Sequence, residues 1–137
     1  MTFVDTNYFL RFLLRDNESQ YEKTKQLFIE ASNGEIELTT SVIVFFEVYW
    51  VLKSFYGKNK SELCEILDKL LALTFIHLEE REILKNSLQF YEAYSLSFED
   101  CYNLIYIKER EVKNLKSFDN KLLKVFRKLF LTRYNQV

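Results

Sequence analysis

Hydrophobic and polar positions along the chain alternate between short strand-like runs and longer stretches with a helical period. Leu10, Leu13 and Leu14, for example, fall on one helical face directly after the apolar run that ends at Val4. Strands that alternate with helices favour a parallel sheet covered by helices on both faces. The pattern predicts strands at 2–4, 36–39, 74–78, 115–118 and 130–134, and helices after residue 5, from 19, at 41–56, from 61, and at 79–94, 99–111 and 120–129.

The predicted fold class is therefore α/β, as a three-layer α/β/α arrangement. We expect a small central, mainly parallel sheet of four or five strands and six or seven helices. Ser19 and Glu22 have the spacing of a capping box that opens the second helix, and Gly34 closes it. The helix at 41–56 is expected to be buried nearly all round and to stop at Gly57.

Composition narrows the possible functions mainly by exclusion. The chain has 137 residues without a linker or repeat, and we expect one domain over 1–137. Two glycines leave no glycine-rich phosphate loop, and the single His77 excludes zinc sites that need paired histidines. Two cysteines without a C-x-x-C pair, together with an N-terminus unlike a signal peptide, favour a cytoplasmic protein.

The net charge of −1 conceals an uneven distribution. Residues 108–137 carry nine basic and three acidic side chains, a net charge of +6, whereas the first 107 residues carry −7. A basic end on an acidic body is suggestive of contact with a polyanion, although a solvated helix face is the more common meaning of a charge run.

Three aspartates lie where a metal ligand or a helix cap would be expected. Asp5 and Asp119 each follow a predicted strand, and ligands of α/β folds bind beyond the carboxyl ends of strands. Each also precedes a helix, where aspartate is a favoured N-cap. Asp100 stands three residues after Ser97, which is the spacing of a capping box. Capping and metal binding both stay open for these residues.

Glu47 is harder to explain as a structural residue, because it is the only charged residue between Val42 and Leu52. Its helical neighbours, which include Ile43 and Trp50, are apolar, so an unpaired carboxylate would carry a desolvation cost of several kcal/mol. A buried ion pair or a metal ion would remove that cost. A metal ion would need further carboxylates, which Asp5, Asp100 and Asp119 can supply.

Four segments taken in order resemble the PIN domain family, and the length resembles the VapC-type toxins of toxin–antitoxin pairs. The segments are Phe3–Asn7, Ser41 leading to Glu47, Ser97–Asp100 and Ser117–Leu122. The match covers essentially the whole chain. Ser117 stands where threonine is common in the family, and Cys101 follows the third acid where alanine is common.

This resemblance implies a ribonuclease that uses Mg²⁺ or Mn²⁺ to activate the water that hydrolyses an RNA phosphodiester. Four acids without clustered His or Cys suit such hard cations and disfavour zinc. The implied partners are RNA, a small antitoxin protein and a second copy in a homodimer. The implied catalytic and metal-binding residues are Asp5, Glu47 and Asp100, with Asp119 in support. Thr6 and Asn7 are expected to orient Asp5 or bound water, and Ser117 is expected to hydrogen-bond within the site. Arg11, Arg15 and Lys121 are candidate RNA contacts.

Two alternatives differ in class from a nuclease. One is a non-catalytic PIN-like module that binds RNA or protein, against which the intact set of four acids counts. The other is phosphate transfer of the haloacid-dehalogenase kind with Asp5 as nucleophile. That chemistry usually needs a second acid two residues on, where this chain has Asn7.

Overall fold

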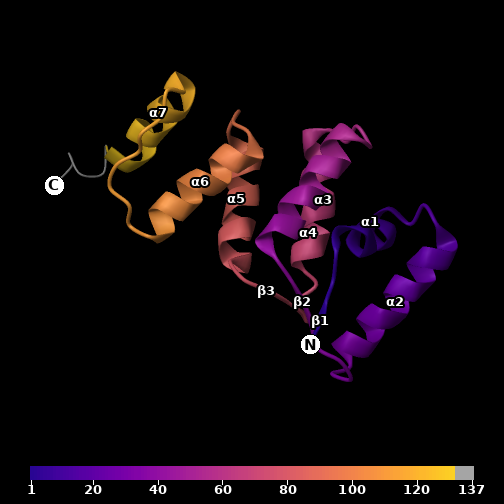
Figure 1. Cartoon of the computed structure of the whole chain (residues 1–137). Helices are drawn as coiled ribbons and strands as arrows, with labels where there is room; N and C mark the ends of the chain where they lie inside the picture. Colours follow the sequence, from indigo (N-terminus) through magenta and orange to yellow (C-terminus); the bar gives the residue numbers. More distant parts are fainter. Residues whose placement is uncertain (132–137) are drawn as a thin grey trace. The chain divides into compact units, whose positions relative to one another are not determined.

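A computed structural model describes residues 1–131 of the chain, which divide into two compact units, Met1–Arg81 and a second that begins at Glu82. The first unit contains β1 (Thr2–Phe3), α1 (Thr6–Leu14), α2 (Glu18–Ser32), β2 (Leu38–Thr40), α3 (Val42–Ser54), α4 (Lys60–Leu71) and β3 (Ile76–Leu78) (Figure 1). The second contains α5 (Arg81–Ala93), α6 (Phe98–Glu109), α7 (Asn120–Phe126) and a turn of π-helix, η1 (Arg127–Leu131).

The sheet of the first unit has three parallel strands in the order β1-β2-β3. Thr2 pairs with Leu38, and Leu38 pairs in turn with Ile76, so β2 is the central strand. This confirms the α/β class and the parallel sheet with seven α-helices in the described part of the chain. The sheet is smaller than predicted, because three strands are formed there instead of four or five.

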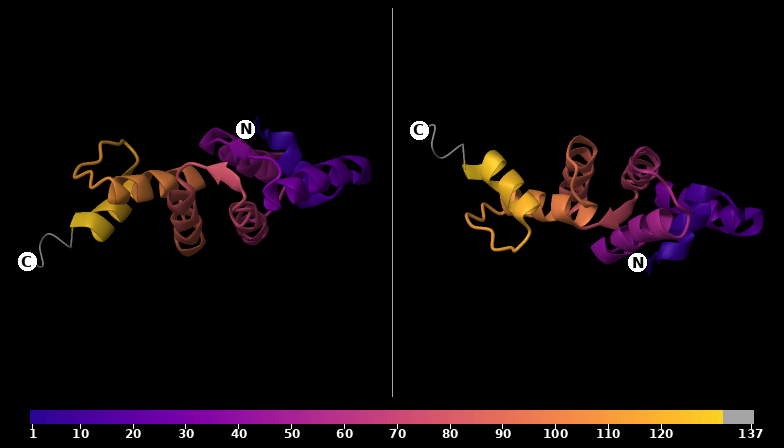
Figure 2. Two further views of the ribbon diagram at one scale, coloured as in Figure 1. Left: turned by 90° about the horizontal axis from the view of Figure 1, so that it is seen from below. Right: turned by 90° about the horizontal axis from the view of Figure 1, so that it is seen from above.

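The core of the first unit comes from the apolar faces of α1, α3 and α4, which pack against one another. Phe9 of α1, Leu52 of α3 and Leu67 of α4 are completely buried. Helix α2 packs against α1, as the views along the other axis also show (Figure 2). The guanidinium of Arg81 donates to the carbonyls of Leu71, Leu73 and Ile76, which fixes the turn between α4 and β3.

Two helix starts differ from the sequence prediction. The N-cap of α2 is Asn17, whose side chain accepts a hydrogen bond from the Gln20 amide, so Ser19 lies inside the helix. The capping box is instead found at α4, where the side chain of Asn59 and that of Glu62 exchange bonds with each other's backbone. The predicted stops are better placed, since Gly34 and Gly57 both adopt positive φ just beyond their helices.

In the second unit, the predicted strand at 115–118 is wrong, because these residues have no regular structure. The side chain of Phe118 is fully exposed, so no apolar face holds this segment in an extended conformation. The predicted edge strand at 130–134 is wrong at Phe130 and Leu131, which belong to η1. Its remaining residues, 132–134, lie outside the described part of the chain.

The second unit buries Leu84 and Leu88 of α5 together with Phe98 and Leu104 of α6. Cys101 on α6 is buried as a free thiol, as is Cys64 in the first unit. Among the described residues, no helix has both the length and the apolar character needed to cross a bilayer.

Candidate metal site and flanking pocket

Asp5 lies at the carboxyl end of β1, in the N-cap position of α1. Its backbone is extended, with φ −90° and ψ 169°, as an N-cap requires, but its side chain makes no capping hydrogen bond. The carboxylate is exposed and has no hydrogen bond or ion pair within residues 1–131. Helix capping therefore does not explain this aspartate, and its oxygens are available to a ligand.

Thr6 connects this end of β1 to the middle of α3. Its side chain is 4% exposed, and its hydroxyl donates to the Glu47 Oε2 atom at 2.8 Å. Asp5 directly precedes Thr6 in the chain, so Glu47 is hydrogen-bonded to the residue next to Asp5. The predicted orienting role of Thr6 is thus placed on Glu47, the acid 41 residues away, and not on Asp5.

Glu47 itself is exposed, so the expectation of a helix buried nearly all round is wrong on this face. Its neighbours Ile43 and Trp50 are apolar but are 77% and 60% exposed. The desolvation cost inferred from the sequence therefore does not apply. The alternative of a buried ion pair does not apply either, since no Lys or Arg of the described residues pairs with Glu47.

The other two acids belong to the second unit. Asp100 is half-buried in the first turn of α6, and its amide donates to the hydroxyl of the N-cap residue Ser97 at 3.1 Å. Its carboxylate makes no hydrogen bond or ion pair within residues 1–131. The half of the predicted capping box in which the Ser97 hydroxyl accepts from the Asp100 amide is present. The Asp100 carboxylate does not complete the box and is available to a ligand.

Asp119 does cap its helix. Its Oδ1 atom accepts a hydrogen bond from the Leu122 amide at 3.1 Å, and its own amide donates to the Ser117 hydroxyl at 3.0 Å. The capping interpretation is therefore confirmed for Asp119, and Ser117 holds the turn that precedes it. One carboxylate oxygen is used by the cap, which leaves the second oxygen for another ligand.

The donors around Thr6 suit a hard divalent cation. Asp5 and Glu47 offer carboxylate oxygens that no cation of the described residues neutralises, and Mg²⁺ or Mn²⁺ prefers such oxygen ligands. Residues 1–131 contain no group of three or more His, Cys, Asp or Glu side chains close enough to hold a metal ion. What the first unit provides by itself is thus a pair of carboxylates.

The candidate RNA contacts are each engaged within the protein. Arg11 donates to both carboxylate oxygens of Asp16, at 2.9 and 3.0 Å, and lies within 3.4 Å of the Tyr56 hydroxyl. The hydrogen bond from Arg11 holds the pKa of Asp16 below its usual value. Arg15 donates to Glu18 at 3.0 Å and covers the ring of Tyr21.

Lys121, the third candidate, donates from its ammonium group to the Ser95 hydroxyl at 3.3 Å, within the second unit. A hydroxyl leaves the charge of the lysine uncompensated, whereas Asp16 and Glu18 neutralise the two arginines. Of the three side chains, Lys121 therefore retains the most attraction for a phosphate.

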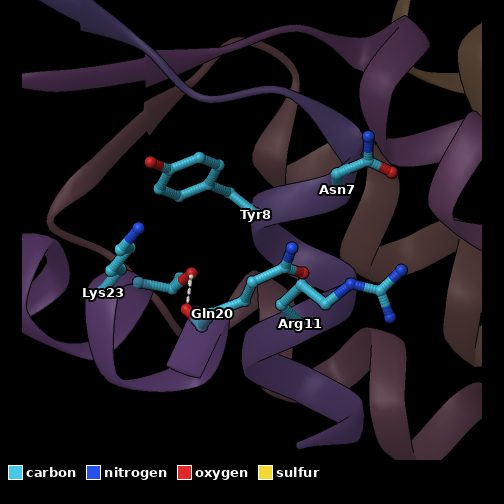
Figure 3. Close-up of a pocket in the computed structure, with 6 residues that line it drawn as sticks. Asn7, Tyr8, Arg11, Gln20 and Lys23 are labelled. Atoms are coloured by element: carbon cyan, nitrogen blue, oxygen red, sulfur yellow. Dashed lines mark hydrogen bonds between the residues drawn. The ribbon is translucent and has the colours of Figure 1, made fainter. Parts of the chain in front are cut away.

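A pocket of about 230 Å³ opens between α1 and α2, next to the start of α1. It is lined by Asn7, Tyr8, Arg11, Gln20, Lys23 and Thr24 (Figure 3). Of these six residues, Asn7 and Arg11 were predicted from the sequence as an orienting residue and an RNA contact, and the other four were not predicted. Their helical spacing was visible, but the pairing of the two helices that makes a pocket of them is a tertiary feature.

Comparison with known proteins was made for the whole chain. Residues 2–128 match the PIN domain family. A curated relative, the VapC ribonuclease of Aquifex aeolicus, is 23% identical over 125 residues, which cover 91% of this chain and 92% of the relative. No solved structure matches significantly. With the family match extending through both units and all four acids, the chain belongs to the PIN domain family.

Proposed function

We propose that this protein is an endoribonuclease that depends on Mg²⁺ or Mn²⁺ and hydrolyses RNA phosphodiester bonds. The observation that carries the proposal is that Thr6, which directly follows Asp5 in the chain, donates its hydroxyl to Glu47, while neither carboxylate has a cationic partner among residues 1–131. Support comes from membership in the PIN domain family and from a relative that is named a ribonuclease. Both carboxylates are exposed, so a ligand can reach them, and a divalent cation is the ligand that carboxylate oxygens of this kind favour.

We propose Asp5, Glu47 and Asp100 as the metal ligands, with Asp119 in support. When bound there, a divalent cation supplies an activated water and stabilises the charge that develops on the phosphate. The protein's own contribution is orientation. Thr6 holds the Glu47 carboxylate by its hydrogen bond, and Ser117 fixes the backbone from which Asp119 projects.

General-base catalysis by imidazole has little support, because the chain has a single histidine, His77 on β3. Carboxylates and a metal ion can perform the same proton transfer, since a bound cation lowers the pKa of water toward neutrality. The shortage of glycine and histidine is thus consistent with phosphate chemistry of this kind.

A role as the toxin of a toxin–antitoxin pair is the finer part of the proposal. It rests on the relative's name and on a similar length, since the alignment covers nine-tenths of both chains. A small antitoxin protein and a second copy of the chain are the expected partners. A cytoplasmic location agrees with two cysteines that are both free thiols.

The proposal is tested by RNA cleavage in Mg²⁺ and in Mn²⁺, with Asp5→Ala and Asp100→Ala as the informative variants. Asp68→Ala is a matched control, because Asp68 is an exposed aspartate on α4 that has no assigned role. We expect both site variants to lose cleavage and the control to retain it. Cleavage that survives EDTA, or that survives both site substitutions, would refute the metal-dependent mechanism.

The same experiment separates the nuclease from a non-catalytic binding module. RNA that is bound by the purified protein but never cleaved, with either metal, would favour the binding module. Cleavage that disappears only in the two site variants would exclude it.

A further inference from the structure

The pocket between α1 and α2 lies within one helical turn of the proposed metal ligand Asp5. The Tyr8 amide donates to the Asp5 carbonyl at 3.2 Å, and Asn7 stands between them in the first turn. One turn of α-helix rises about 5.4 Å, which is within the reach of a neighbouring nucleotide of a strand bound at Asp5. The inference that follows rests on the proposed nuclease function.

The polar groups of the pocket are notable for their lack of internal partners. The side chains of Asn7, Tyr8, Gln20 and Lys23 make no hydrogen bond or ion pair within residues 1–131. They nevertheless line one pocket, where Figure 3 shows the Tyr8 ring and the Lys23 ammonium group on the same side, above α2. The Thr24 hydroxyl is different, since it donates to the Gln20 carbonyl at 3.0 Å.

The charge of the pocket is positive and comes from one residue. Arg11 is neutralised by Asp16, whereas Lys23 has no acidic partner in the described chain, and no described lining residue is acidic. A lysine with three free donors is a typical ligand for a phosphate oxygen. Lys23 is thus a stronger candidate for an RNA contact than either arginine of α1.

The size and chemistry of the pocket match one nucleotide. Its volume of about 230 Å³ lies below the roughly 300–1,000 Å³ of sites for drug-sized ligands, which suits one unit of a longer strand. Tyr8 is 43% exposed and offers a ring face on which an unpaired base can stack. The amides of Asn7 and Gln20 carry both donors and acceptors, which can pair with the edge of a base.

We infer that the pocket between α1 and α2 binds one unpaired nucleotide of the RNA substrate next to the cleaved bond. Tyr8 stacks on its base, Lys23 binds its phosphate, and the amides of Asn7 and Gln20 contact the base edge. A stacked and splayed base is available only in single-stranded RNA. The pocket therefore selects single-stranded over duplex substrate.

The test measures binding without cleavage, by fluorescence anisotropy of a short labelled single-stranded RNA in EDTA at several salt concentrations. The variants are Lys23→Met, Tyr8→Ala and Tyr8→Phe. Lys25→Met is the matched control, because Lys25 is an exposed lysine of the same helix outside the pocket. Circular dichroism of each variant checks that the fold is retained.

Lys23→Met should reduce the slope of log affinity against log salt by about 0.7, the value for one lost phosphate contact on a single strand. Lys25→Met should leave that slope unchanged. Tyr8→Ala should weaken binding roughly 5- to 150-fold, and Tyr8→Phe, which keeps the ring, should bind nearly as wild type. A duplex of the same sequence should bind more weakly and be insensitive to Tyr8→Ala.

Failure of this inference can be distinguished from failure of the nuclease proposal. If wild type cleaves RNA while Lys23→Met equals the control and Tyr8→Ala binds normally, the pocket assignment is wrong and the nuclease stands. If RNA is bound through Tyr8 and Lys23 but not cleaved with metal, the pocket assignment stands and the nuclease does not. Absence of RNA binding by wild type in EDTA overturns the pocket assignment alone, because the nuclease is judged by cleavage in the presence of metal.

Discussion

Replacement of Thr6 by valine removes one hydroxyl group and keeps the shape of a buried side chain. The hydroxyl donates to Glu47 at 2.8 Å, and hydrogen bonds to charged groups contribute about 1.5–3 kcal/mol when they are shielded from water. Glu47 is exposed, so water can replace the lost donor. We therefore expect the free energy of unfolding to fall by only about 0.5–1.5 kcal/mol.

Metal affinity should respond more strongly than stability. Without the Thr6 hydroxyl, the Glu47 carboxylate is free to rotate and must be ordered again when a cation binds. Loss of a partner that orients a metal ligand typically reduces affinity about 10- to 100-fold. Thr6→Ser keeps the hydroxyl and should restore most of the affinity, although it loses a buried methyl group.

Titration with Mn²⁺, followed by electron paramagnetic resonance, measures the affinity, and urea denaturation measures the stability. Ser87→Ala is the control for a general loss of stability, because Ser87 is fully buried on α5 and its hydroxyl donates to the Ile83 carbonyl at 2.6 Å. It should lower stability and leave Mn²⁺ affinity unchanged. Equal affinity in wild type and Thr6→Val, or no rescue by Thr6→Ser, would refute the orienting role.

Three further predictions concern single residues. Asp119→Asn should keep the cap to the Leu122 amide and its stability but weaken Mn²⁺ binding, whereas Asp119→Ala should also lose about 0.5–2 kcal/mol in urea denaturation; equal stability of the two would contradict the cap. The lowered pKa of Asp16, caused chiefly by the hydrogen bond from Arg11, means that its contribution is present above its ordinary value of 3.8 and is lost as the pH falls through the lowered value. Because this pair is exposed, Asp16→Asn should reduce the free energy of unfolding by only about 0.2–1 kcal/mol at neutral pH. The decline of the free energy of unfolding below pH 4 should be flatter in Asp16→Asn than in wild type, and parallel curves of stability against pH for the two proteins would contradict this. Leu67→Ala, in the core of the first unit, should cost about 2–5 kcal/mol by urea denaturation, and a smaller loss would mean that the core collapses around the cavity.

Local sequence signals predicted the helices and strands of the first unit well. The error at the start of α2 arose where two residues were equally suitable as the N-cap. Asn17 and Ser19 are equally good N-caps, and the helix begins at the earlier one. Gly34 had no competitor, because it is one of only two glycines and no proline is present to end the helix. The end of α2, which has one strong stop signal, was therefore predicted more accurately than its start, which has two candidate N-caps.

The strand predicted at 115–118 failed for a different reason. The segment 115–118 was predicted as a short strand ending at Asp119, but a strand of four residues is held by its neighbours and not by its own sequence. In the structure, Leu115 is half-buried and Phe118 is fully exposed. The same segment instead uses the Ser117 hydroxyl to support the Asp119 cap, which is a local interaction.

Lys23 shows why part of the site could not be found from sequence. A lysine in the middle of a charged helix has many equivalents in this chain, and nothing local distinguishes it from Lys25. The distinction arises only because α2 packs against α1, which places Lys23 beside Tyr8 and leaves it without an acidic partner. Arg11 and Arg15 looked equally suitable in sequence, yet both are neutralised by acids that lie three to five residues away.

For Glu47, the burial expected from the sequence is wrong, while its assignment as a metal ligand stays a prediction. Apolar neighbours at helical spacing suggested burial, but Ile43 and Trp50 are themselves exposed, and an apolar neighbour that is exposed desolvates nothing. The stronger argument is the contact with Thr6. A buried threonine that donates its hydroxyl to an exposed carboxylate gains little stability, since water would serve that carboxylate equally well. The benefit of the bond is a fixed carboxylate, and a fixed carboxylate is what the proposed divalent cation requires of its ligand.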